Sequence, residues 1–184
     1  MESRLIVSVH YNQPQARSIL ACAFKEQFAI EEMPPAFICI GSDRHLLDCL
    51  GPMTGTMLEE KTPGVLVMGT LDHPWHAGNI GYNLREFRNT YPPRTVVAID
   101  ASIGEDDPPG LIKLKHGPIK PGKAVQKNLP GVGDYSITAV VGNRDYRPSS
   151  GSIKKISLAH VYGMARVISD AIVEWHRGSR GQPG

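Results

Sequence analysis

The sequence has few cysteines, no long apolar run and almost no excess charge, and each shortage excludes a class of protein. Its three cysteines form no CxxC pair, so a disulfide scaffold is excluded and a reduced, cytoplasmic protein is expected. The N-terminal apolar stretch is too short for a signal sequence, and no segment approaches the ~18 apolar residues of a membrane span. Because 20 Lys and Arg oppose 18 Asp and Glu, the net charge of +2 favours neither nucleic acid nor a membrane as partner.

What is present indicates one compact domain. The chain has 184 residues, 41% of them hydrophobic, which is enough to bury a sizeable core without a disulfide or a metal. Its 19 glycines and 15 prolines are interleaved with apolar runs, as is typical of a turn-rich globular protein. We expect a single domain over 1–177 and a flexible, polar tail over 178–184.

The apolar pattern alternates between strands and helices. Continuous apolar runs predict buried strands, a short run at 5–9 predicts an edge strand, and three-to-four spacing predicts helices. The predicted strands are 5–9, 36–40, 65–68, 95–99, 112–114 and 135–141, and the predicted helices are 13–28, 51–60, 77–90 and 152–176. Such alternation favours an α/β fold, with a mostly parallel sheet covered by helices on both faces.

Acidic residues follow two of the predicted buried strands. Asp43 and Asp48 come after the strand 36–40, and Asp100 ends the strand 95–99. Ligands of open α/β sheets collect at the carboxyl ends of strands, so neighbouring strands would bring Asp48 and Asp100 together. Such a pair could act as acid and base on a water molecule, or hold a divalent metal. Alternatively, Asp48 caps the helix that begins near Gly51.

The remaining motifs bear on metal binding, phosphate binding and nucleophilic catalysis. Asp72, His73 and His76 could contribute to a metal site, but Pro74 bends the chain between the two histidines and no complete ligand set is visible, so a turn is the favoured interpretation. No phosphate-binding loop and no G-x-S-x-G nucleophile elbow is present, and no histidine can be assigned to activate Cys49.

The same segments resemble the sporulation protein YyaC family. The resemblance rests on CIGSDR (39–44), DCLGP (48–52), GTLD (69–72), AIDA (98–101), IKPGKAV (119–125) and VGD (132–134), and it extends over about residues 36–175. That family is similar to the spore germination protease and, more remotely, to the hydrogenase maturation endopeptidases. The resemblance therefore implies a three-layer α/β/α sandwich of the phosphorylase/hydrolase-like kind.

The resemblance also implies a peptidase of spore-forming cells. Asp48 and Asp100 match the two catalytic aspartates of the germination protease, and we expect Asp43 and His76 to bind or orient the substrate. The maturation enzymes bind a metal through two acids and a downstream histidine. In this chain Pro121 and Gly122 occupy the region where that histidine would be expected. We therefore expect no cofactor, a protein or peptide substrate, and a location in the sporulating cell or spore. A non-catalytic binding protein, a metal-dependent maturation endopeptidase and a homo-oligomer are the alternatives left open.

Overall fold

The computed structural model describes residues 3–29, 33–120, 131–143 and 157–180. Within this part of the chain, six strands form one sheet in the order β1-β5-β6-β4-β2-β3. Their bounds are β1 (Arg4–His10), β2 (Ala36–Cys39), β3 (Val67–Met68), β4 (Val96–Gly104), β5 (Leu111–His116) and β6 (Tyr135–Asn143). The pairings among β6, β4, β2 and β3 are parallel, whereas β5 runs antiparallel to both β1 and β6. The predicted α/β fold is confirmed, and its sheet is mixed.

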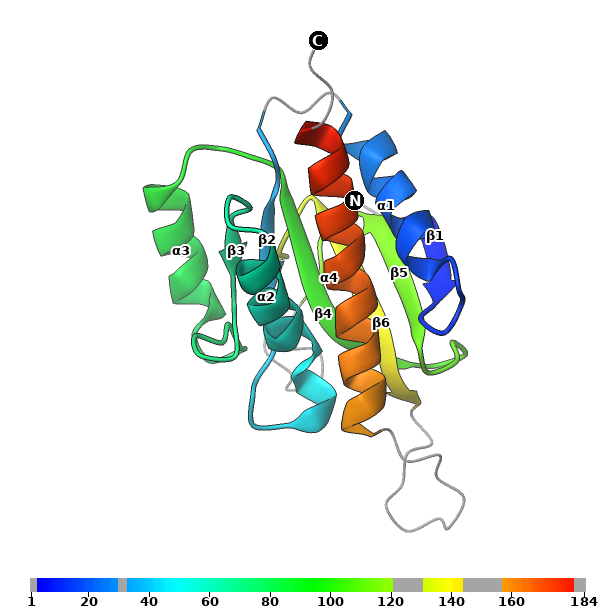
Figure 1. The fold of residues 1–184 in the computed structure, drawn as a ribbon. Helices are drawn as coiled ribbons and strands as arrows, with labels where there is room; N and C mark the ends of the chain where they lie inside the picture. Colours follow the sequence, from blue (N-terminus) through cyan, green and yellow to red (C-terminus); the bar gives the residue numbers. More distant parts are fainter. Residues whose placement is uncertain (1–2, 30–32, 121–130, 144–156, 181–184) are drawn as a thin grey trace.

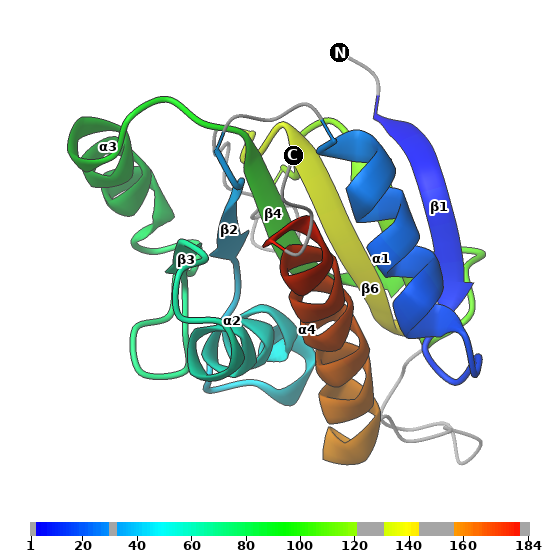
Figure 2. The ribbon, with the colours of Figure 1, turned by 45° about the horizontal axis from the view of Figure 1, so that its top comes forward.

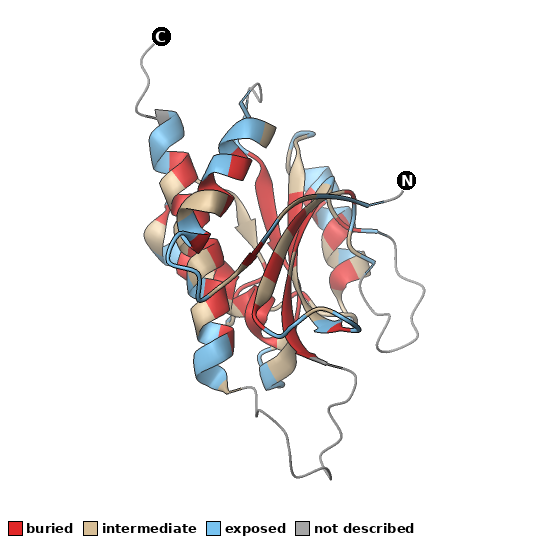
Figure 3. Cartoon of the chain, turned by 90° about the vertical axis from the view of Figure 1, so that its right-hand side faces the viewer, coloured by how far each residue is buried: buried red, intermediate tan, exposed pale blue. Residues whose placement is uncertain are grey.

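Helices cover both faces of this sheet, which gives three layers (Figures 1 and 3). The helices are α1 (Ala16–Gln27), α2 (Leu50–Lys61), α3 (Ile80–Thr90) and α4 (Leu158–Arg180), with a short 3-10 turn, η1 (Leu46–Asp48). Successive side chains of a strand point to opposite faces. Accordingly, Phe37 and Cys39 pack in the core shared with α1, α2 and α4, whereas Ile38 packs in the core shared with α3.

The long helix α4 lies between α1 and α2 and packs against both (Figure 2). Its fully buried residues include Met164, Ile168 and Ile172, so one stripe of the helix faces the sheet. Near its C-terminal end, the Trp175 ring contacts Phe24 and Phe28, with ring centroids 6.3 and 5.6 Å apart. These contacts join the last helix to the first, and they fix α4 across the middle of the sheet.

The element boundaries differ from the predicted ones where local contacts decide them. The helix α3 begins at Ile80, because Asn79 and the preceding turn are tied down by hydrogen bonds of their own. The helix α4 continues through Arg180, so the prediction of a flexible tail from residue 178 is wrong for 178–180. Residues 181–184 and 152–156 lie outside the described residues. Among the described helices, none is both long and apolar enough to cross a membrane.

Candidate active site at the carboxyl end of β2

The site begins where β2 ends beside the middle of its parallel neighbour β4. In the register between β2 and β4, Cys39 pairs with Ile99, and the next backbone amide, that of Ile40, donates to the Ile99 carbonyl at 2.7 Å. β2 ends at Cys39, whereas β4 continues past Asp100 to Gly104 along β6, so the prediction that Asp100 ends its strand is wrong. Asp100 lies just beyond the last pair with β2, and β4 contacts η1, the turn that contains Asp48.

That loop folds back over the end of β2. The Ser42 amide donates to the Asp48 carbonyl at 3.0 Å, and the Asp48 amide donates to the His45 carbonyl at 2.9 Å. A side chain at Gly41, whose φ is +144°, would place a Cβ 2.0 Å from the Asp48 carbonyl oxygen. Gly51 is equally close to the Ile40 carbonyl oxygen, at 2.0 Å from an ideal Cβ. Both glycines thus permit the close backbone contacts that hold Asp48 over the strand end.

The two carboxyl groups interact electrostatically. Burial raises the pKa of Asp100 to about 8, with a smaller contribution from the negative charge of Asp48, while a hydrogen bond from the Ala101 amide opposes the shift. Burial also raises the pKa of Asp48, but the positive charges of His45 and His76 and the Ser42 amide lower it. At neutral pH Asp100 therefore holds its proton, and the pKa of Asp48 is also raised on balance, because burial outweighs the charges of His45 and His76.

His76 is held firmly beside this pair. Its backbone amide donates to Asn79 Oδ1 at 2.9 Å, and Asn79 Nδ2 donates to the Pro74 carbonyl at 2.9 Å. The Gly78 amide donates to His76 Nδ1 at 3.0 Å, so a neutral His76 carries its proton on Nε2. The Trp75 carbonyl also accepts the Gly41 amide at 2.9 Å, which joins the His76 segment to the end of β2.

Three other residues of this loop, Asp43, His45 and Cys49, lie around Asp48 in the chain. Asp43 is exposed, and among the described residues no hydrogen bond or ion pair joins it to the two acids. The predicted helix cap at Asp48 is wrong, because Cys49 occupies the N-cap position of α2 and no side chain caps that helix end.

Sequence reasoning missed His45, which is exposed and acts on Asp48 through its charge. Its place in the same short loop as Asp48 was the available signal.

Cys49 is poorly suited to act as a nucleophile. Burial and the neighbouring Asp48 charge raise the pKa of its thiol, and its Sγ donates to the Leu46 carbonyl at 3.2 Å. A nucleophilic cysteine needs a lowered pKa. The carboxyl pair is therefore the more reactive feature of this loop.

A hollow of about 440 Å³ lies next to the site and shares His76 with it. Polar side chains predominate in its lining, with Pro74 and Trp75 as the apolar part. The lining residues are Asp72, His73, Pro74, Trp75, His76, Asn79 and Asn83. The hollow meets the site at His76, and neither Asp48 nor Asp100 lines it.

The donor set does not match a metal centre. Among the residues that the structure describes, no three His, Cys, Asp or Glu side chains gather closely enough to hold a metal ion. Asp72, His73 and His76, which the sequence suggested as metal ligands, do not form such a group. The described side chains supply no third ligand beside Asp48 and Asp100, so these two acids do not make up a complete zinc site.

Comparisons with known proteins agree with this fold. The chain is 32% identical to the Bacillus subtilis (strain 168) protein called "Uncharacterized protein YyaC", over 78% of this chain and 73% of that protein. Its fold is similar to that of a NiFe hydrogenase maturation protease, HycI, from Thermococcus kodakarensis KOD1. That match has a TM-score of 0.50 and 18% identity, and it covers 81% of this chain and 97% of the other.

A family model described as "Protein of unknown function (DUF1256)" matches residues 8–171, nearly the whole described chain. The matched range includes the loop after β2, which carries Asp48, and the whole of β4, which carries Asp100. The chain belongs to the DUF1256 family and is a relative of YyaC of B. subtilis.

Proposed function

We propose that the protein is an aspartate-dependent endopeptidase that cleaves a protein substrate. The observation that carries the proposal is the inequality of the two carboxyl groups. Burial raises the pKa of both acids, that of Asp100 to about 8, and the charges of His45 and His76 oppose the rise at Asp48 alone. Two neighbouring carboxyl groups whose environments separate their pKa values are the requirement for combined acid and base catalysis.

In this mechanism the two acids have different roles. The Asp48 carboxylate accepts a proton from a water molecule, which then attacks the carbonyl carbon of the scissile peptide bond. Asp100 donates its proton to the amide nitrogen as the carbon–nitrogen bond breaks. The reaction leaves a carboxylic acid and an amine, and the proton taken up by Asp48 returns to Asp100 through water.

His76 and the adjoining hollow are proposed to position the substrate. The ring of His76 holds its Nε2 proton available as a donor, because Nδ1 already accepts the Gly78 amide. The same residue lines the polar hollow next to the acid pair, which offers room for the substrate on the α3 side. We assign Asp43, exposed in the loop after β2, to contact with the incoming chain.

The fold of the HycI protease supports a peptidase at the level of architecture alone, because the two chains share 18% identity. The resemblance to the spore germination protease supports the same class of reaction. On that resemblance we propose that the protein acts in the cytoplasm of the sporulating cell or spore.

The test compares purified wild-type protein with Asp48→Asn and Asp100→Asn on a panel of proteins from sporulating cells. Each amide variant is expected to lose about 10²-fold or more of the cleavage rate, since each removes one partner in proton transfer. Glu26→Gln is the matched control, because Glu26 is exposed on α1, which packs beside β1. Cleavage that survives both aspartate changes would refute the mechanism. An inactive wild type would instead favour a binding protein that uses the acids as a ligand site.

A further inference from the structure

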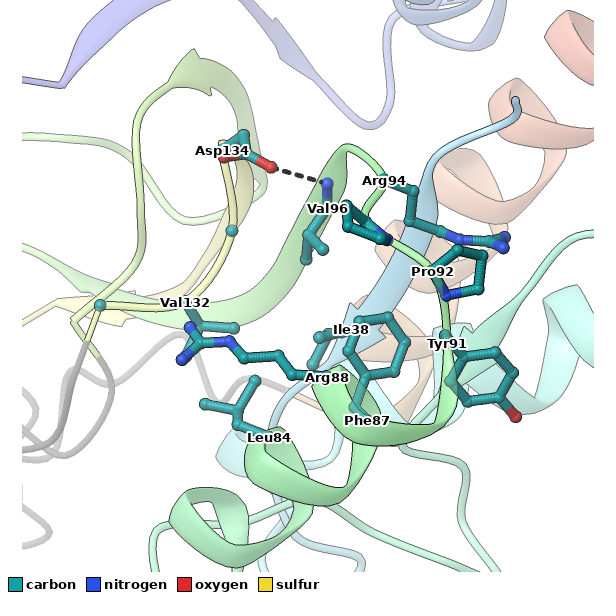
Figure 4. A pocket seen from close by; sticks show the side chains of 13 residues that line it. Ile38, Leu84, Phe87, Arg88, Tyr91, Pro92, Arg94, Val96, Val132 and Asp134 are labelled. Carbon is teal, nitrogen blue, oxygen red and sulfur yellow. Dashed lines mark hydrogen bonds between the residues drawn. The ribbon is translucent and has the colours of Figure 1, made fainter. Parts of the chain in front are cut away.

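A second hollow, of about 340 Å³, lies at the other end of the sheet from the acid pair (Figure 4). It forms where residues 91–96 lead into β4 and residues 131–134 lead into β6, and α3 supplies the remaining wall. Val96 begins β4, whereas Asp100 lies further along the same strand toward its carboxyl end. This pocket is therefore separate from the candidate active site.

The floor of the pocket is apolar. Ile38 from β2, Leu84 and Phe87 from α3, and Val132 are all buried, and Val96 adds a further aliphatic side chain. Small-molecule pockets begin at about 300 Å³ and are mostly apolar, with a few polar groups that fix the orientation of the ligand. A volume near this lower limit suits a ligand the size of a single amino acid.

Two opposite charges line the same pocket without pairing. In Figure 4 the side chain of Arg88 extends from α3 toward Val132, while Asp134, from the same segment as Val132, lies beside Val96. One Asp134 oxygen accepts the Val96 amide at 2.9 Å, which fixes the carboxylate at the start of β4. Within the described residues, no ion pair involves Arg88 or Asp134. Arg88 and Asp134 are both exposed, so the pocket offers a cation and an anion at its solvent-facing rim, above the apolar floor.

The second arginine of the lining does not change this arrangement. Arg94 extends in the opposite direction from Arg88 in Figure 4. Its Nε is buried and has no hydrogen-bond partner among the described residues. Arg88 is thus the cation at the Val132 end of the pocket, and the total charge of the lining favours a carboxylate over a second cation.

We propose that this pocket binds a free α-amino acid with an apolar side chain. The guanidinium of Arg88 pairs with the ligand carboxylate, for which its planar donors are well suited. The free oxygen of Asp134 accepts from the ligand ammonium group, and the side chain lies on Leu84 and Val132. A zwitterion satisfies both charges at once, whereas an ion of one sign leaves one of them without a partner.

The test uses three probes that share a phenylethyl body. L-Phenylalanine carries both charges, 3-phenylpropionate only the negative one and phenethylamine only the positive one. Calorimetric titration of the full chain is expected to show the tightest binding for L-phenylalanine. Arg88→Gln is expected to weaken it about tenfold or more and to remove its advantage over phenethylamine. Asp134→Asn, which keeps an acceptor for the Val96 amide, is expected to remove its advantage over 3-phenylpropionate.

Arg85→Gln is the matched control, because Arg85 is exposed on the same helix and is not part of the lining. It removes one positive charge from α3, as Arg88→Gln does, and is expected to leave binding unchanged. Asp48→Asn is likewise expected to bind L-phenylalanine as the wild type does. Equal binding of the three probes would overturn the proposal, as would equal effects of the two arginine variants or loss of binding in Asp48→Asn. So would the absence of saturable binding by about 50 mM ligand, well above a Kd of about 1 mM.

Discussion

The protonated state of Asp100 makes the stability of the protein depend on pH in a direction opposite to that of most carboxyl groups. Its pKa rises from 3.8 to about 8 on folding, chiefly through burial. Between these pH values the folded state keeps a proton that the unfolded state loses, so the free energy of unfolding falls as pH rises. The stability that the protonated Asp100 contributes is fully present below about pH 4 and is lost by about pH 8.

Asp100→Asn removes this dependence. At about 1.4 kcal/mol per pKa unit, the cost of ionising Asp100 in the folded protein is at most about 6 kcal/mol. A neutral asparagine mimics the protonated acid in size and charge, so the variant is expected to match the wild type near pH 4. Above pH 8 it is expected to be more stable by about 2–6 kcal/mol, since it has no proton to lose.

Urea unfolding of both proteins at a series of pH values between about 4 and 9 measures this difference, because the midpoint reports stability when the slope is constant. Asp48→Asn offers an internal comparison. It removes the smaller, electrostatic cause of the shift and leaves burial in place, so it should reduce the pH dependence without abolishing it. A stability difference between Asp100→Asn and the wild type that is the same at every pH would refute the reasoning.

Two further predictions concern the loop after β2 and its neighbours. His76→Gln removes a positive charge that lowers the pKa of Asp48, so the acidic limb of the pH–rate profile for cleavage should move to higher pH. The basic limb, set by the pKa of Asp100 near about 8, should stay where it is; a fixed acidic limb would contradict the proposed coupling. Gly51→Ala places a Cβ 2.0 Å from the Ile40 carbonyl oxygen and should destabilise the protein by about 2 kcal/mol or more. Gly81→Ala, in α3 with nothing within 4 Å, should instead be neutral or stabilising by up to about 1 kcal/mol in thermal unfolding, and equal losses in both would argue against the contact.

Local patterns of apolar residues predicted most of the fold, because they reflect which faces of each strand or helix are buried. The apolar runs 36–40 and 96–99 lack polar residues because both faces of the sheet are covered there, by α1, α2 and α4 on one side and by α3 on the other. The helical spacing of α4 likewise records one buried stripe. The direction of β1 and β5 was not predictable in this way, since a short strand pattern is the same whichever way it pairs.

The candidate site was predictable only in part. Acids after two apolar runs pointed to Asp48 and Asp100, because ligands of parallel sheets collect where strands end. The continuation of β4 past Asp100 was not predictable, because it depends on pairing with β6. The part played by His45 was not visible, since an exposed loop histidine carries no distinguishing pattern. The tautomer of His76 depends on a hydrogen bond from Gly78, and no spacing rule indicates it.

The sequence by itself determined which segments are buried and which acids follow them, because apolar periodicity and strand ends are properties of short stretches of chain. Only the tertiary structure decided how the two acids differ, since their pKa values depend on burial and on charges brought from other segments. The same holds for the pocket between Arg88 and Asp134, whose walls come from α3 and from the chain leading into β4 and β6. Such contacts depend on the packing of distant segments, and no local pattern records them.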